Sequence, residues 1–291
     1  MFAIETRKLS KYYGKARGIV DLDLTVAKGE FFGFIGPNGA GKSTTIRTLL
    51  GLIEPSGGEA SVLGMDIGSE RKKILSRIGY LPSEAVFHSG MRVKDVLKLS
   101  ADLRGCHCDG EAKALCARLG LDIGRKVEEL SFGNRKKVGI VCALQHRPEL
   151  LILDEPTSGL DPLMQREFFE ILQERNRDGT TIFLSSHILS EIQRNCRRAA
   201  IIREGRIIAC DSVEALARSN AKRVTLSGEA ELSGLSGVRD LKCDGDSFSF
   251  LYGGDMDDLI RCLGRGHVRE LSIAEPDLDE IFMHYYEEDG Q

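Results

Sequence analysis

Short apolar runs and one long amphipathic stretch organise this chain. The continuous apolar runs at residues 31–35, 150–153 and 182–184 are typical of parallel strands that are buried on both faces. From residue 93 to about residue 147 the apolar positions recur at helical spacing, which predicts helices inserted between two parts of a sheet. The pattern therefore predicts an α/β fold with a helical insertion.

Shorter segments predict further strands. Residues 3–9 alternate apolar and polar side chains enough to predict an edge strand, and residues 22–26 predict a second strand. The turn-rich residues 55–58 predict a hairpin, and residues 78–81 predict a short strand that ends at Pro82.

Residues 36–44 read Gly-Pro-Asn-Gly-Ala-Gly-Lys-Ser-Thr and lie between a predicted strand and a predicted helix. This spacing matches the phosphate-loop pattern, in which glycines let successive amides converge on phosphate oxygens at a helix N-terminus. Lys42 is expected to contact the β and γ phosphates, and Ser43 to offer a hydroxyl to Mg²⁺. The residues expected to contact the nucleotide are Gly36, Asn38, Gly39, Ala40, Gly41, Lys42, Ser43 and Thr44.

Acidic and imidazole side chains follow two of the buried strands. Asp154 and Glu155 end the run at residues 150–153, at the strand end where α/β sheets bind ligands. We expect Asp154 to hold Mg²⁺ through water and Glu155 to polarise the attacking water. A lone histidine is usually structural, but His187 follows the next strand and is expected to reach the γ-phosphate and this water.

Two further positions have competing interpretations. The ring of Tyr13, upstream of the phosphate loop, can stack on a purine, or Tyr12 and Tyr13 can simply pack at a strand end. Ser131 and Gly133 precede another apolar helix and form a possible anion-binding nest. A serine that only caps the helix is the default interpretation of that segment on its own.

Composition narrows the class of protein. The 291 residues, 42% hydrophobic and 29% charged, predict a soluble chain of about two domains. The net charge of −4 provides no electrostatic footprint for nucleic acid. Because no apolar run approaches the roughly 20 residues of a membrane span and no secretory signal is evident, we expect a cytoplasmic location.

The eight cysteines are expected to be free thiols in a reducing compartment. Cys106, His107 and Cys108, with Cys116 further on, suggest a metal site, but their spacing matches no common zinc pattern. We therefore expect a loop with reduced thiols there.

Taken together, residues 3–211 resemble the nucleotide-binding subunit of an ATP-binding cassette (ABC) transporter. The matching motifs, in order, are an aromatic loop at Tyr13, Walker A at residues 36–44, a signature at residues 130–134, Walker B at residues 150–155, a D-loop at Leu160 and Asp161, and a switch histidine at His187. The resemblance implies a P-loop NTPase with a RecA-like α/β core, an antiparallel β subdomain and a helical subdomain at about residues 84–147, all within residues 1–211.

The resemblance also implies cofactors and partners. ATP and Mg²⁺ are sandwiched between two such subunits, in a homodimer or a heterodimer, and Ser131 and Gly133 of one subunit contact the γ-phosphate held by the other. Asp161 of the D-loop is also expected to bind the nucleotide. An integral-membrane permease is the expected partner, which places the chain on the inner face of the cell membrane. No nucleic-acid partner is expected.

The chain departs from the family pattern in two places. Ser83 stands where a glutamine usually contacts both Mg²⁺ and the transmembrane partner, and it could reach the metal only through a water. Phe132 and Asn134 stand in the signature where glycine and glutamine are usual, while Ser131 and Gly133 are kept. We expect activity, with a weakened or asymmetric closure.

Residues 212–291 form a separate α+β accessory domain in this interpretation. The predicted element order is βββαβα, with strands near residues 223–226, 240–243 and 248–252 and a final helix at residues 277–286. The acidic-apolar tail near Phe282 resembles the tail on ATPase subunits of bacterial drug, antibiotic and sodium exporters. A packing module without a ligand of its own is the alternative.

The leading hypothesis is a Mg·ATP-driven subunit that powers a separate membrane permease, most simply an exporter. An ABC-type ATPase acting on the ribosome or on nucleic acid is the first alternative, although such relatives usually carry two cassettes or long coiled coils. A regulatory cassette that binds ATP without useful hydrolysis is the second, and the presence of Glu155 and His187 argues against it.

Overall fold

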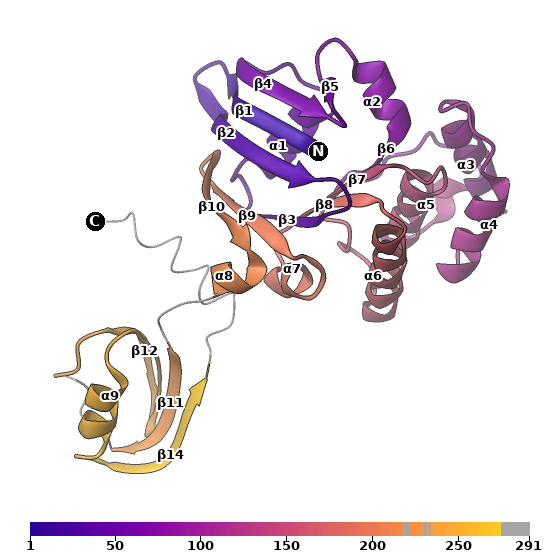
Figure 1. Cartoon of the computed structure of the whole chain (residues 1–291). Helices are drawn as coiled ribbons and strands as arrows, with labels where there is room; N and C mark the ends of the chain where they lie inside the picture. The colour runs from indigo at the N-terminus through magenta and orange to yellow at the C-terminus, as the bar shows by residue number, and fades with distance from the viewer. Residues whose placement is uncertain (218–221, 230–231, 233, 275–291) are drawn as a thin grey trace. The chain divides into compact units, whose positions relative to one another are not determined.

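The structure is a computed structural model that describes residues 1–217, 222–229, 232 and 234–274. The chain divides into two units, Met1–Val213 and Glu214–Gln291 (Figure 1). The assignment of residues 1–211 to an ATPase domain and of residues 212–291 to an accessory domain stays a prediction.

A six-stranded sheet, in the order β10-β9-β3-β8-β7-β6, forms the centre of the first unit. Five strands run parallel, and β10 closes one edge antiparallel to β9. β3, β7 and β8 are buried along their whole length, as their continuous apolar sequences require. The strands are β3 (Phe31–Ile35), β6 (Ile78–Leu81), β7 (Leu150–Asp154), β8 (Thr181–Ser186), β9 (Arg198–Arg203) and β10 (Arg206–Ser212).

A second, antiparallel sheet has the order β2-β1-β4-β5. Its strands are β1 (Phe2–Tyr13), β2 (Ala16–Ala27), β4 (Gly57–Val62) and β5 (Met65–Asp66). The prediction of an edge strand near the N-terminus is wrong, because β1 pairs with β2 on one side and with β4 on the other. The alternation of apolar and polar residues along β1 arises because one face of the sheet is buried. Interior strands of an antiparallel sheet show this alternation as well as edge strands.

The hairpin predicted at residues 55–58 is misplaced. Gly57 and Gly58 begin β4, and Gly58 packs against the backbone of β1. The tight turn instead joins β4 to β5 at Leu63 and Gly64, whose φ angles are 54° and 77°. Asn-Gly or Asp-Gly, the usual signals of such a turn, do not occur there, which explains the error.

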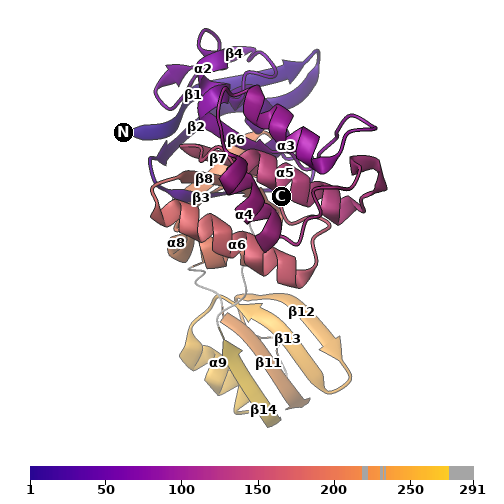
Figure 2. The same ribbon diagram turned by 90° about the vertical axis from the view of Figure 1, so that its right-hand side faces the viewer.

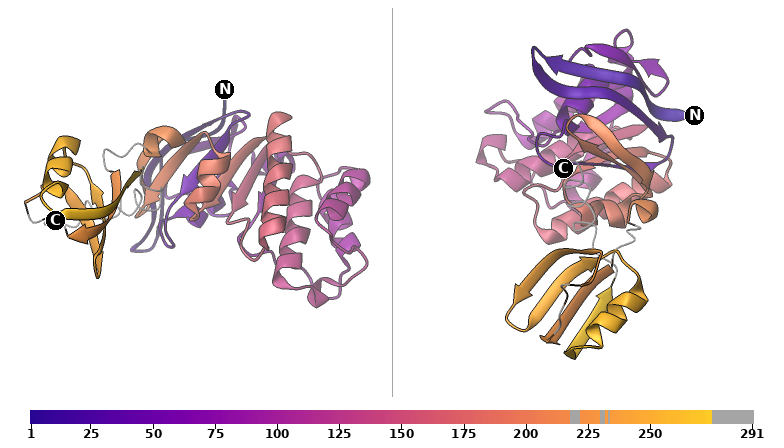
Figure 3. Two further views of the ribbon diagram at one scale, coloured as in Figure 1. Left: turned by 90° about the horizontal axis from the view of Figure 1, so that it is seen from below. Right: turned by 90° about the vertical axis from the view of Figure 1, so that its left-hand side faces the viewer.

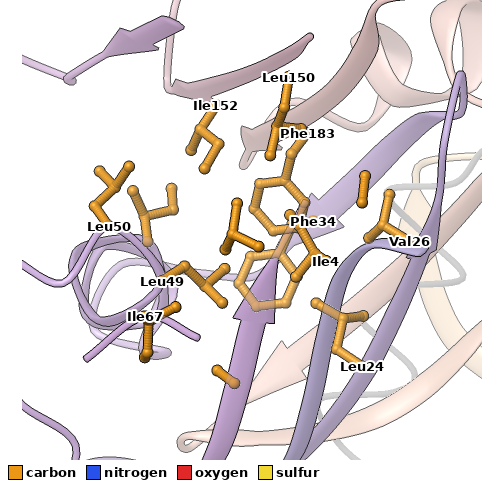
Figure 4. Packing of buried hydrophobic residues seen from close by; sticks show 14 of the residues in the cluster. Ile4, Leu24, Val26, Phe34, Leu49, Leu50, Ile67, Leu150, Ile152 and Phe183 are labelled. Atoms are coloured by element: carbon orange, nitrogen blue, oxygen red, sulfur yellow. The ribbon is translucent and has the colours of Figure 1, made fainter. Parts of the chain in front are cut away.

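The two sheets and α1 (Lys42–Leu49) share one hydrophobic core. Figure 4 shows Phe34 and Phe183 of the central sheet beside Ile4 and Val26 of the antiparallel sheet, with Leu49 of α1 on the other side. The rings of Phe34 and Phe183 have centroids 5.2 Å apart. Burial of each such side chain contributes about 1.5–3 kcal/mol, so the core fixes the helix that follows the phosphate loop.

The helical spacing predicted from residue 93 onward corresponds to α3, α4 and α5, which lie between β6 and β7 in the chain; α4 and α6 lie side by side, joined by ion pairs (Figure 2). The described helices all fall short of what a bilayer crossing requires in length and apolar character. Besides α1 they are α2 (Arg71–Arg77), α3 (Val93–Asp102), α4 (Asp109–Arg118), a 3₁₀ turn (Val127–Glu129), α5 (Phe132–Leu144), α6 (Pro162–Arg177), α7 (Leu189–Asn195), α8 (Val213–Ala217), which begins at the last residue of the first unit, and α9 (Met256–Leu263) in the second unit.

The second unit is a four-stranded antiparallel sheet in the order β12-β13-β11-β14, with α9 against one face (Figure 3). Its strands are β11 (Lys222–Glu229), β12 (Val238–Asp244), β13 (Ser247–Tyr252) and β14 (His267–Ala274). Leu259 and Leu263 of α9 pack on Val224, Leu226 and Phe250 of the sheet. After α8, which was not predicted, the described elements follow the predicted order βββαβ, and the final helix predicted at residues 277–286 lies outside the described residues.

Candidate functional site

The phosphate loop joins β3 directly to α1. Gly39 and Gly41 have φ angles of 81° and 111°, a region in which residues with side chains are strained. A Cβ on Gly36 would lie 2.4 Å from the carbonyl oxygen of Ile202. Because α1 begins immediately after the loop, its unpaired first-turn amides face the same space as the loop backbone. The backbone therefore offers N–H donors to an anion.

Lys42 is buried inside this loop, with 5% of its surface exposed. Its Nζ donates hydrogen bonds to the carbonyl oxygens of Gly36 at 2.6 Å and Pro37 at 3.2 Å. The same Nζ lies 3.3 Å from Glu155 Oε1. The loop therefore holds an ammonium group where it can neutralise phosphate charge, and that ammonium is already paired with the predicted catalytic carboxylate.

Ser43 and Asp154 meet at the end of β7. Ser43 Oγ donates to Asp154 Oδ2 at 2.9 Å, and Ser185 Oγ donates to Asp154 Oδ1 at 3.2 Å. Asp154 is 3% exposed. Carboxylate and hydroxyl oxygens are the hard donors that Mg²⁺ prefers, and Mg²⁺ commonly binds one or two carboxylates together with substrate phosphates. The donor set therefore fits magnesium.

Glu155 has an unusual backbone for a residue with a side chain, since its φ angle is 48°. Its N–H donates to the carbonyl oxygen of Ser185 at 2.9 Å, and its own carbonyl accepts from Lys136 Nζ at 3.0 Å. A residue held in this region costs about 1–3 kcal/mol, and such residues cluster at functional sites. The surrounding hydrogen bonds therefore hold Glu155 in a conformation that it would not adopt alone.

His187 lies directly after β8 and contacts Glu155. Its Nδ1 is 2.5 Å from Glu155 Oε2. Glu191 of α7 braces this contact, because it accepts hydrogen bonds from Ser186 Oγ at 2.8 Å and from Thr157 Oγ1 at 2.6 Å. Ser186, just before His187, and Thr157, two residues after Glu155, thus both donate to the buried carboxylate of Glu191.

A cavity of about 360 Å³ lies beside the phosphate loop and Glu155. It is lined by Arg17, Gly18, Pro37, Asn38, Gly39, Gly41, Lys42, Ser43, Thr44, Ser83 and Glu155. Gly36 and Ala40 are buried within the loop. Tyr13 does not line the cavity, but its ring packs against Gly18, which does. The cavity brings together the phosphate loop, the predicted base and Ser83, and the ring of Tyr13 lies next to its wall.

Ser131, Gly133 and Asp161 lie apart from this cavity. Ser131 Oγ caps α5 by accepting from the Asn134 N–H at 3.3 Å, and Asp161 Oδ1 caps α6 by accepting from the Met164 N–H at 3.0 Å. A Cβ on Gly133 would lie 2.5 Å from the carbonyl oxygen of Gly159, so the two segments pack together. Within one chain, Ser131, Gly133 and Asp161 are therefore not among the residues that line the cavity with Lys42.

Sequence reasoning missed Ser185 and Glu191. It assigned Arg135, Lys136 and Lys137 to a solvated face, which is wrong for Lys136. Lys136 is 2% exposed, and its burial lowers the pKa of the ammonium to about 8. A signal was available, because Lys136 lies one helical turn before Ile140 on the core-facing side of α5. Ser185 and Glu191 carried no such signal, since a polar residue ending a strand or beginning a helix is common.

Comparisons with known proteins agree on one class. The sequence profile described as "ABC transporter" matches residues 19–158. The bacitracin transport ATP-binding protein BcrA of Bacillus licheniformis is 39% identical over 225 residues, which cover 75% of this chain and 72% of that protein. The daunorubicin/doxorubicin resistance ATP-binding protein DrrA of Streptomyces peucetius is 34% identical, with coverage of 97% and 91%.

Solved structures extend the likeness to the fold. A structure described as the ATP binding subunit of an ABC transporter has 32% identity and a TM-score of 0.70, covering 74% of this chain and 92% of that one. The dimeric cassette MJ0796 has 22% identity and a TM-score of 0.67, with coverage of 72% and 98%. At that identity the second likeness concerns the fold alone.

Proposed function

This chain belongs to the family of ABC transporter ATP-binding proteins, and from that premise we propose that it is a Mg²⁺-dependent ATPase subunit that drives a separate membrane permease. ATP binding and hydrolysis are the activity of this family. One observation carries the residue assignments: Lys42, Glu155 and His187 form a contiguous set beside the Ser43–Asp154 pair, at a cavity floored by the phosphate loop.

The residues divide the work of phosphoryl transfer. The loop amides and Lys42 bind and neutralise the nucleotide phosphates, while Ser43 and Asp154 would hold Mg²⁺, which would supply further positive charge to neutralise them. Glu155 accepts a proton from the attacking water, and His187 orients that carboxylate and the γ-phosphate. Tyr13 would stack on the base next to the cavity wall, and Ser83, which lines the cavity, would contact the metal through a water.

Ser131, Gly133 and Asp161 serve the nucleotide of a second subunit in this proposal. Ser131 is exposed at the start of α5, whose N-terminus favours an anion. Because these residues do not line the cavity that contains Lys42, we assign them to a nucleotide that a partner cassette presents. The proposed ATPase domain is residues 1–211, with the helical subdomain at about residues 84–147.

The cargo class is inferred from the relatives. BcrA is named for bacitracin transport, and other similar proteins are named for resistance to linearmycin, in Bacillus subtilis, and to daunorubicin and doxorubicin. We therefore propose that the permease exports an antibiotic or similar amphipathic compound, and that this chain docks on the inner face of the membrane that contains it.

The variant Glu155→Gln tests the assignment of the base. We expect hydrolysis to fall by about 10²- to 10⁴-fold, because a positioned general base contributes on that order. ATP binding should persist, since Lys42 and the loop remain, and a closed ATP-bound dimer should accumulate. Phosphate release, equilibrium ATP binding and size-exclusion chromatography measure the three quantities.

Glu170→Gln, an exposed position on α6, is the matched control and should hydrolyse ATP at the wild-type rate. Wild-type turnover in Glu155→Gln would remove Glu155 from the role. Hydrolysis stimulated by RNA or ribosomes, and not by membranes containing the permease, would favour the alternative class of ABC protein.

A further inference from the structure

Lys136 is a buried cation outside the motifs that bind phosphate. It lies on α5, five residues after Ser131, and is 2% exposed. Its Nζ donates three hydrogen bonds to backbone carbonyl oxygens: to Ser83 at 2.7 Å, to Glu155 at 3.0 Å and to Pro82 at 3.1 Å. A lysine ammonium has three N–H donors, so every donor of this group is used.

These three carbonyls come from two segments that border the nucleotide cavity. Pro82 and Ser83 follow β6, and Ser83 lines the cavity wall. Glu155 follows β7 and supplies the carboxylate that contacts Lys42 and His187. One side chain on α5 therefore connects the loop after β6 to the backbone of the proposed base.

The hydrogen bond from Lys136 acts on the strained backbone of Glu155. Glu155 has a φ of 48°, and its peptide groups are held on both sides, by Ser185 at the N–H and by Lys136 at the carbonyl. The direction of the Glu155 side chain depends on this backbone conformation. The Glu155 carbonyl also accepts a longer hydrogen bond from the Ser158 N–H at 3.4 Å. Loss of the bond from Lys136 would leave the carbonyl with this weaker partner alone and would allow the peptide to rotate.

A purely structural role would not require an ammonium here. An unbranched apolar side chain such as methionine fills similar space on a helix without the cost of desolvating a charge. A charge with all three donors aimed at backbone carbonyls supplies what an apolar side chain cannot, namely a fixed distance between separate chain segments.

We propose that Lys136 is a positioning residue of the ATPase: its ammonium holds the backbone of Glu155 in the left-handed conformation and couples it to the Pro82–Ser83 loop at the cavity wall. This inference rests on the proposed role of Glu155 as the base. If Lys136 has this role, a change of the side chain at position 136 should alter the rate of hydrolysis but not the affinity for ATP.

The first test compares Lys136→Met and Lys136→Gln with the wild-type chain. We expect kcat to fall about 10- to 100-fold in Lys136→Met, since a misplacement of about 1 Å can cost 10²-fold. The KM for ATP should change less than about threefold, because Lys42 and the loop are intact. Lys136→Gln keeps two N–H donors and should lose less activity. Lys137→Met, the next residue on α5 and half-buried, is the control and should match the wild type.

The second test is a double-mutant cycle with Glu155→Gln. If Lys136 acts through Glu155, adding Lys136→Met to Glu155→Gln should leave the residual single-turnover rate unchanged within about twofold. A further fall by the factor seen in the wild-type background would overturn the inference, as would a loss of ATP affinity equal to the loss of rate.

The two proposals fail in different ways. Wild-type activity in Glu155→Gln would overturn the role of the base, whereas an inactive Glu155→Gln with a fully active Lys136→Met would overturn only the inference about Lys136. Circular dichroism and thermal unfolding identify a variant that does not fold. If Lys136→Met is such a variant, the same cycle with Lys136→Gln decides, since partial donation predicts a partial, non-additive loss of rate.

Discussion

The missing side chain of Gly159 allows the turn before α6 to pack against Phe132 at the start of α5. The φ angle of Gly159 is 80°, and a Cβ at this position would lie 2.2 Å from Cδ1 of Phe132. Phe132 stands where the family usually has glycine, and its ring covers the turn that leads to Asp161 and α6. The aromatic ring in the signature is thus accommodated by the absence of a side chain in the facing turn.

The variant Gly159→Ala should therefore be destabilised for two reasons. The backbone strain and the clash with the ring together should lower the free energy of unfolding by about 2–4 kcal/mol. Gly90→Ala is the matched control, because Gly90 has a φ of 83° with open space around it and isolates the cost of the backbone. Urea denaturation measures both variants.

Adding Phe132→Ala to Gly159→Ala should restore the part of the stability lost to the clash. Equal destabilisation of Gly159→Ala and Gly90→Ala, with no rescue by Phe132→Ala, would show that the ring moves aside without cost.

At the scale of elements, ion pairs join α4 to α6. Arg118 of α4 donates to Glu167 at 2.6 Å and to Glu174 at 2.5 Å and 3.0 Å. Glu111, near the start of α4, contacts Arg175 of α6 and also Arg147. Because these charges are only partly removed from water, each ion pair should contribute modestly to the free energy of unfolding. The bidentate contact of Arg118 with Glu174 nevertheless fixes α4 and α6 in one register.

The variant Arg118→Met should lower the free energy of unfolding by about 1 kcal/mol at low ionic strength, and by less in 1 M NaCl, because salt screens part-exposed pairs. Arg166→Met is the control: its pair with Glu170 lies within α6 and is largely exposed, so the loss should be about 0.3–0.5 kcal/mol. A loss for Arg118→Met that is no larger than that of the control would mean that the α4–α6 contact depends on apolar packing alone.

Elements with a strong local signal could be predicted from the sequence. The strand at residues 31–35 was predicted with its observed bounds, because a fully buried strand ended by a glycine-rich loop has clear limits. The strand predicted at residues 150–153 ends one residue later, at Asp154. The helix beginning at Pro162 follows from the preference of proline for the first turn.

Long-range pairing could not be predicted in the same way. Whether β1 lies at an edge depends on β4, more than 40 residues away, and no local pattern encodes that neighbour. β9 was not predicted because its apolar core is flanked by arginines, and α7 because it is only seven residues long. Similarly, the strand-end rule placed Lys42 and Glu155 near each other, but the contacts of Lys136 required the assembled fold.

At the scale of the whole molecule, the distribution of predicted site residues is uneven. The phosphate loop and Glu155 line one cavity, and Asp154 and His187 contact its lining residues Ser43 and Glu155. The other predicted site residues, Ser131, Gly133 and Asp161, do not line it. In the proposed function, one chain therefore provides two separate half-sites: a nucleotide-binding half around Lys42 and a capping half around Ser131 that contacts the nucleotide of the other subunit. Symmetric pairing of two chains would complete two sites at once, since a two-fold axis brings each half to the other.

A mixing experiment separates this arrangement from a site made by one chain. Lys42→Ala removes the ammonium from the nucleotide-binding half. Ser131→Asp disables the capping half by placing negative charge against phosphate, while aspartate still caps α5. Each variant alone should be nearly inactive, because every site in its dimer has one defective half.

If the chain pairs with itself, an equal mixture should recover about a quarter of the wild-type rate, since half of the dimers are mixed and each contains one site with two intact halves. Mixing Lys42→Ala with Glu155→Gln is the control: both defects fall in the nucleotide-binding half, so no intact site can form and no recovery is expected. Recovery in the first mixture but not in the second requires that Ser131 act on the nucleotide of the other subunit. An inactive first mixture would show that a different protein supplies the second cassette.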